Sequence, residues 1–144
     1  MSQRETEFSE TRRILAEKDA QGAYDNGDSF IYRYEKDDEF LLLLCELFES
    51  DWHKNHENMA RAFQCISNPI TAKSLFKVAF SDFDYYAWNE YYPMQRKCTW
   101  ALADIGTPEA RAYLEEIAQQ ANEMVSGFAR KRLDNWDSEL HRKG

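Results

Sequence analysis

The sequence predicts an all-α fold, a short α-α solenoid of helical hairpins with an additional N-terminal helical segment. The first observation is a repeat: residues 56–79 align with residues 95–118 at an offset of 39 residues, with five identical positions. The second is a capping residue followed by proline at the same place in both copies. The third is the recurrence of apolar residues at three- and four-residue steps. At 144 residues the chain suits one domain, residues 1–144.

Residues 1–51 form the first segment, expected to hold acidic N-terminal helices and a loop. A polar helix is predicted over residues 5–19. The glycines, asparagine and aspartates of residues 20–36 predict an ordered loop. Asp37 or Asp38 then caps a helix that is apolar on nearly all sides, and this helix is expected to be buried.

Residues 52–81 are predicted to form the first hairpin. Asp51 can cap a helix that runs from Trp52 to Ile66. A second, antiparallel helix then begins at Pro69, because Asn68 is a good N-cap and proline needs no amide hydrogen at the first helical position.

The second hairpin, residues 93–121, repeats this arrangement with Gly106, Thr107 and Pro108. Residues 82–92 form an aromatic and acidic insertion between the hairpins. Residues 122–144 are predicted to form a C-terminal helix.

The segment KCTWALADIGTPEARAYLEEIA, Lys97–Ala118, resembles a bacterial HEAT-like (armadillo-type) repeat. The resemblance implies antiparallel helix pairs and a surface that binds other proteins. Small acidic HEAT-like proteins of this size are similar to immunity proteins, which bind and block a bacterial toxin domain. Other HEAT-like proteins are lyases or assembly factors for tetrapyrrole-carrying proteins, or hydroxylases whose di-iron site uses His-Glu pairs. A structural scaffold subunit is a further alternative.

The net charge is −8, and all of it falls in residues 1–51, which hold 14 acidic and 6 basic side chains. This charge opposes nucleic acid or an anionic membrane as the ligand and favours a basic protein partner, such as a toxin domain that is a nuclease. The amino terminus lacks the apolar core of a signal peptide, so we expect a cytoplasmic protein. We also expect the chain to be monomeric when free.

The insertion is the main functional prediction. Aromatic side chains with polar tips are enriched at protein interfaces, and carboxylates among them suit a basic partner. The alternative is that the rings fill the seam between repeats. The predicted partner-binding residues are Asp82, Phe83, Asp84, Tyr85, Tyr86, Trp88, Glu90 and Tyr91, with Trp52, His53 and His56 beside them.

The histidines raise the question of a metal. His53 and His56 are three residues apart on the predicted helix, and His56-Glu57 resembles a hydroxylase His-Glu unit. The second copy has Gln95-Arg96 at the equivalent position, so we expect no metal or other cofactor and no catalytic residue. The three cysteines, Cys45, Cys65 and Cys98, are expected to be buried, reduced and without a catalytic role.

Overall fold

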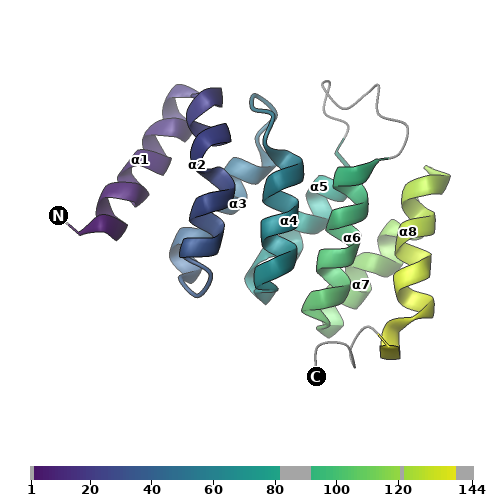
Figure 1. Ribbon diagram of the computed structural model, residues 1–144. Helices are drawn as coiled ribbons and strands as arrows, with labels where there is room; N and C mark the ends of the chain where they lie inside the picture. The colour runs from purple at the N-terminus through teal and green to yellow at the C-terminus, as the bar shows by residue number, and fades with distance from the viewer. Residues whose placement is uncertain (1, 82–91, 121, 139–144) are drawn as a thin grey trace.

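The computed structural model describes residues 2–81, 92–120 and 122–138 (Figure 1). In these ranges the chain consists of helices and their connections, which confirms the predicted all-α class. The described helices are α1 (Gln3–Glu17), α2 (Ala20–Arg33), α3 (Asp38–Glu49), α4 (His56–Ile66), the short 3-10 helix η1 (Pro69–Thr71), α5 (Ala72–Ala79), α6 (Pro93–Ile105), α7 (Pro108–Ile117) and α8 (Glu123–Asp134).

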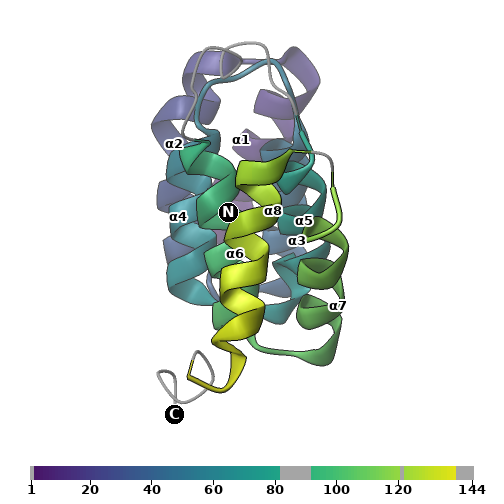
Figure 2. The same cartoon turned by 90° about the vertical axis from the view of Figure 1, so that its right-hand side faces the viewer.

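The helices pack in two layers. Helices α2, α4 and α6 lie side by side in one layer, and α3, α5 and α7 lie side by side in the other (Figures 1 and 2). Helix α1 packs against α3 and α2, and α8 packs against both α6 and α7. The chain therefore runs back and forth between the layers, and the connections α1–α2, α3–α4 and α7–α8 lie at one edge, the upper edge of Figure 1.

The two copies of the sequence repeat fold into equivalent helix pairs. Asn68 and Thr107 each cap a helix with the side-chain oxygen, and a proline follows each of them. The aligned pair Ala62 and Ala101 is fully buried. The same holds for three other aligned pairs: Phe63 and Leu102, Leu75 and Leu114, and Val78 and Ile117. The repeat thus encodes caps and core contacts.

Helix α3 begins after Asp37, its N-cap, as predicted. The expectation that the whole helix is buried was wrong, because only one side packs against the core and Leu42 on the other side is 51% exposed.

The first aromatic residue of this helix, Phe40, connects α3 to α1 and α2. The ring of Phe40 contacts Phe8 of α1 at 5.3 Å, Phe30 of α2 at 5.9 Å and Tyr34, which stacks on it at 4.1 Å between centroids. Such aromatic contacts stabilise the packing of the first three helices beyond the area they bury.

The prediction of a loop over residues 20–36 was wrong, because residues 20–33 form α2. Asp19 caps this helix by accepting a hydrogen bond from the Gly22 amide at 3.0 Å. Glycine and asparagine are poor helix formers in isolation. At Gly27, however, an added Cβ would lie 3.0 Å from Nδ2 of Asn55 and 3.1 Å from Sδ of Met59. Glycine therefore allows α2 to approach α4 closely, a requirement that only the packed fold imposes.

The predicted start of the next helix was also wrong. Helix α4 begins at His56 rather than at Trp52, and Asp51 does not cap it. Residues 50–55 form a loop between α3 and α4, and two of its side chains, those of His53 and Asn55, are buried.

Among the residues that the structure describes, no helix combines the length and the apolar character needed to cross a membrane.

The contact at Gly27 gives a testable prediction. Replacing Gly27 by Ala is expected to destabilise the fold by about 1–2 kcal/mol, because overpacking costs about 1–3 kcal/mol and the helix propensity of alanine returns at most about 1 kcal/mol. The matched control is Gly127→Ala in α8, where the added Cβ meets nothing within 4 Å. The free energy of unfolding of that variant is expected to rise by about 0.5–1 kcal/mol. The measurement is the free energy of unfolding in urea; equal stabilisation by both substitutions would contradict the close approach.

Candidate partner-binding site

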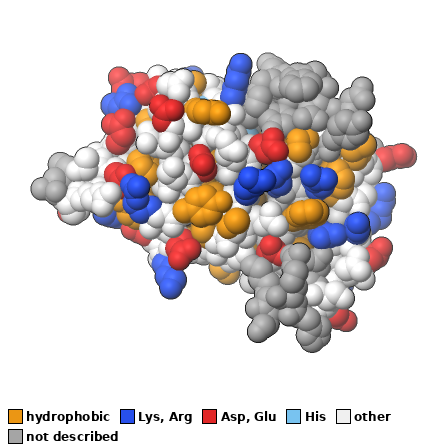
Figure 3. Space-filling view, viewed as in Figure 1, with side chains coloured by type: hydrophobic (Ala, Val, Ile, Leu, Met, Phe, Trp, Pro, Cys, Tyr) orange, Lys and Arg blue, Asp and Glu red, His pale blue; other side chains and the backbone are white. Residues whose placement is uncertain are grey.

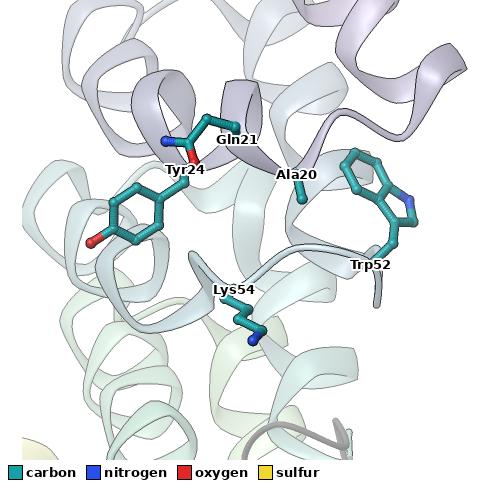
Figure 4. Close-up of a pocket in the computed structure, with 5 residues that line it drawn as sticks. All are labelled: Ala20, Gln21, Tyr24, Trp52 and Lys54. Atoms are coloured by element: carbon teal, nitrogen blue, oxygen red, sulfur yellow. The ribbon is translucent and has the colours of Figure 1, made fainter.

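A pocket of about 310 Å³ opens at the edge where the start of α2 meets the α3–α4 loop. Tyr24 and Trp52 lie on opposite sides of it, with Lys54 below them in the view of Figure 4. Ala20 and Gln21 complete the lining. The Tyr24 side chain is 53% exposed, whereas Trp52 is half-buried against the core. The pocket thus offers two large rings to a partner at a small cost in side-chain entropy.

The loop that carries Trp52 and Lys54 is held by two stacked imidazoles. His53 and His56 are buried, and their ring centroids are 4.1 Å apart at an interplanar angle of 13°. Nε2 of His53 lies 2.6 Å from the Leu47 carbonyl oxygen, and Nε2 of His56 lies 2.7 Å from that of Ser50. The last carbonyls of a helix have no partner within it, so the two rings satisfy acceptors at the end of α3.

These hydrogen bonds define the tautomer of His53. Its Nδ1 accepts a hydrogen bond from the Asn55 amide at 3.1 Å, so the ring proton is on Nε2, which donates to Leu47. A neutral imidazole can donate from Nε2 and accept at Nδ1. A protonated imidazole carries a proton on both nitrogens, so its Nδ1–H would lie against the Asn55 N–H. The geometry therefore needs His53 to be uncharged.

Asn55 connects the same loop to α2. Its Nδ2 donates to the Ala23 carbonyl at 3.1 Å and to Oδ1 of Asp28 at 3.0 Å. Its Oδ1 accepts a hydrogen bond from Asn58 at 3.0 Å. Because the buried amide is satisfied on both sides, it fixes the loop against α2 and with it the distance across the pocket.

Burial lowers the pKa of both histidines. For His56, loss of solvation has the largest effect and the neighbouring His53 adds to it, which brings the pKa to about 3. For His53, burial lowers the pKa although the hydrogen bond to the Leu47 carbonyl opposes the shift. Both rings are therefore neutral at pH 7.

The burial corrects the predicted roles of His53 and His56. We expected both on a helix surface in contact with a partner, but their relative exposures are 1% and 0%. Nε2 of each ring lies against a carbonyl oxygen at the end of α3 rather than on the surface. Trp52 lines the pocket together with Tyr24 and Lys54, two residues that the sequence did not single out.

Most of the predicted binding residues lie outside the described part of the chain: Asp82, Phe83, Asp84, Tyr85, Tyr86, Trp88, Glu90 and Tyr91. The described residues on either side of this stretch, Ser81 and Tyr92, adjoin the end of α5 and the start of α6. Both of these helix ends lie at the same edge as the α3–α4 loop (Figure 1).

Several carboxylates of residues 1–51 form ion pairs with arginines of the same segment. Arg4 pairs with Asp37 at 2.9 Å and with Glu39 at 2.6 Å. Arg13 contacts three carboxylates, and Arg33 pairs with Glu7. The hydrogen bonds from Arg4 and Arg13 lower the pKa values of Asp37 and Glu10. A partner would therefore meet fewer uncompensated charges here than the composition implies.

Two exposed carboxylates, which adjoin Tyr24 and Trp52 in the sequence, have no such arginine partner among the described residues. Asp51 precedes Trp52, and no other described residue makes a hydrogen bond or ion pair with its side chain. Asp25 follows Tyr24 and accepts a hydrogen bond from Gln21 at 2.8 Å. Within the part of the chain that the structure describes, neither carboxylate belongs to the pocket lining, in which Lys54 is the only charged residue.

The cysteines agree with the prediction in two cases. Cys45 and Cys98 are buried, whereas Cys65 is exposed, contrary to expectation. Burial raises the pKa of Cys45 to about 11 and that of Cys98 still further, so neither thiol ionises at neutral pH.

The described residues contain no group of three or more His, Cys, Asp or Glu side chains that could hold a metal ion. The sequence raised His53 and His56 as possible metal ligands. In the structure, Nε2 of each ring points at a backbone carbonyl oxygen. Glu57 forms an ion pair with Lys97 at 2.8 Å.

Comparison with known proteins finds no matching family model, curated protein or solved structure. The resemblance to HEAT-like repeats therefore rests on the repeat within this chain alone.

The histidine pair makes the fold sensitive to acid. The unfolded chain binds protons at its histidines near pH 6.5, whereas the folded chain does not, so the stabilisation is complete above about pH 6.5 and is lost as the pH falls. Between pH 6 and pH 5 we expect the free energy of unfolding to drop by up to about 1.4 kcal/mol per pH unit for each histidine.

The control is His56→Gln, which introduces the residue found at the equivalent position of the next helix pair, Gln95. It should be less stable than the natural chain at pH 7 but lose less stability between pH 7 and pH 5. Urea unfolding at several pH values measures both quantities. An unchanged pH dependence in the variant would contradict a neutral, buried His56.

Proposed function

We propose that the chain is a non-catalytic protein-binding module that works as an immunity-type inhibitor of a basic toxin domain. The observation that carries the proposal is the aromatic pocket at the loop edge, with Tyr24 and Trp52 as its walls. Asp25 and Asp51 are exposed and adjoin these two residues in the sequence. Aromatic anchors surrounded by polar residues are typical of the energetic centre of protein interfaces.

The pocket suggests how such a partner would dock. Lys54 disfavours a cation inside the pocket, so an apolar or aromatic side chain would fill it between Tyr24 and Trp52. Lysine or arginine residues elsewhere on the partner would then pair with exposed carboxylates of the chain such as Asp25 and Asp51. The segment 82–91 adds three acidic and five aromatic residues and is attached at the same edge of the fold.

A non-catalytic role is supported by the state of the candidate reactive groups. The two buried imidazoles hold backbone carbonyls, and the thiols of Cys45 and Cys98 are buried with raised pKa values. None of these groups is placed to transfer a proton to a substrate or to attack one. A cytoplasmic location and a bacterial toxin system are part of the same proposal.

The test uses the tagged chain to capture proteins from its host and then measures the affinity of the purified basic partner by calorimetry. Tyr24→Ala and Trp52→Ala should each weaken binding by about 30-fold or more, the loss typical of a hot-spot residue. The matched control is Tyr32→Ala, which removes a ring on the same helix that is 44% exposed and lies outside the pocket lining.

Tyr24→Ala is the decisive variant, because its exposed ring can be removed with little effect on the core. If it binds the partner as tightly as Tyr32→Ala does, the pocket is not the docking site. If coexpression of the chain leaves the partner's toxicity unchanged, the inhibitor role is excluded.

A further inference from the structure

The layer of α2, α4 and α6 carries a second surface that is basic although the whole chain is acidic. Lys and Arg side chains gather on the face where Figure 1 shows α4, α6 and α8 (Figure 3). Under them lies a hollow of about 520 Å³ whose lining includes Arg61, Arg96, Lys97 and Trp100. It shares no lining residue with the Tyr24–Trp52 pocket.

Trp100 is the aromatic residue in the lining of this basic hollow. The guanidinium carbon of Arg96 and that of Arg132 each lie 5.4 Å from the centroid of its ring. Guanidinium groups that stack on an indole lose rotational freedom before any ligand binds, so less entropy is lost when they form hydrogen bonds. Residues from α6 and α8 are thus ordered around one aromatic ring.

Two guanidinium groups at this surface have unused donors. Arg61 and Arg96 are exposed, and neither guanidinium forms a hydrogen bond or ion pair with another described residue. In this they differ from Arg4, Arg13 and Arg33, which are paired with carboxylates of the chain itself. The planar fork of arginine matches a carboxylate, with which it forms two parallel hydrogen bonds.

The surrounding charges limit which anion can bind. Asp104 lines the same hollow and accepts a hydrogen bond from Gln64 at 3.3 Å. Lys97, another residue of the lining, forms an ion pair with Glu57. A nucleic acid places a phosphate at every step and needs a continuous basic track. This surface is interrupted by carboxylates, so isolated acidic side chains suit it better than a polyphosphate.

We propose that the basic hollow binds an acidic segment of a partner protein. A carboxylate of that segment is held between Arg61 and Arg96, and a neighbouring aromatic side chain packs on Trp100. The site is separate from the Tyr24–Trp52 pocket in residues and in charge, so either proposal can fail without the other.

The experiment measures fluorescence anisotropy of a dye-labelled peptide of alternating Glu and Tyr at low ionic strength. A peptide of alternating Gln and Tyr keeps the rings and removes the charges, and a labelled oligothymidylate supplies phosphates. We expect the Glu-Tyr peptide to bind at least about tenfold more tightly than either of the other probes, because charge-assisted hydrogen bonds to arginine need carboxylates.

Charge reversals locate the site. Arg61→Glu and Arg96→Glu should each weaken binding of the Glu-Tyr peptide by about tenfold or more. The control is Lys73→Glu, which reverses the charge of an exposed residue of α5 in the other layer and should weaken binding less than about twofold. Thermal unfolding of each variant checks that the fold is retained. Arg96→Lys should give an intermediate loss, because it keeps the charge but not the fork.

The proposal is overturned if the Glu-Tyr peptide does not bind at low ionic strength. It is also overturned if Lys73→Glu weakens binding as much as Arg61→Glu and Arg96→Glu do, or if the oligothymidylate binds more tightly than the peptide.

Discussion

The pair of neutral imidazoles in the α3–α4 loop is the interaction on which the rest of the structure depends. His53 and His56 stack on each other, satisfy carbonyls at the end of α3 and place Asn55 where it can bond to α2. Three helices are connected by this short loop. Without those hydrogen bonds, several buried polar groups would lose their partners at once, which is costly in a low-dielectric interior.

The same loop links stability to the proposed function. Trp52 and Lys54 belong to the loop and line the pocket, and Trp52 contacts His53 edge-on at 5.4 Å between ring centroids. The position of the pocket wall is therefore set by buried hydrogen bonds rather than by the exposed residues themselves. A binding site built in this way is ordered before a partner arrives, which reduces the entropy lost on association.

Local signals predicted the parts of the fold that local chemistry decides. Asn68-Pro69 and Thr107-Pro108 begin helices because a capping oxygen and a fixed φ angle act within one turn. Helix α2 could not be predicted in this way, because Gly27 is required by the approach of Asn55 and Met59 of a later segment. The roles of His53 and His56 were misassigned for a related reason: their partners are carbonyls of α3, which a helix running from Trp52 would have kept out of reach.

The two proposed surfaces differ in their side chains: two aromatic rings line the Tyr24–Trp52 pocket, whereas guanidinium groups line the basic hollow. The first of them depends on the loop that His53 and His56 hold in place. The most direct test of this account is an NMR titration of the imidazole nitrogens of His53 and His56. The account predicts that His53 is the neutral tautomer with the proton on Nε2 and that its pKa is lower than that of a free imidazole. It also predicts that His56 does not become protonated between pH 7 and pH 5. Titration of both rings near pH 6.5, as in an unfolded chain, would contradict it.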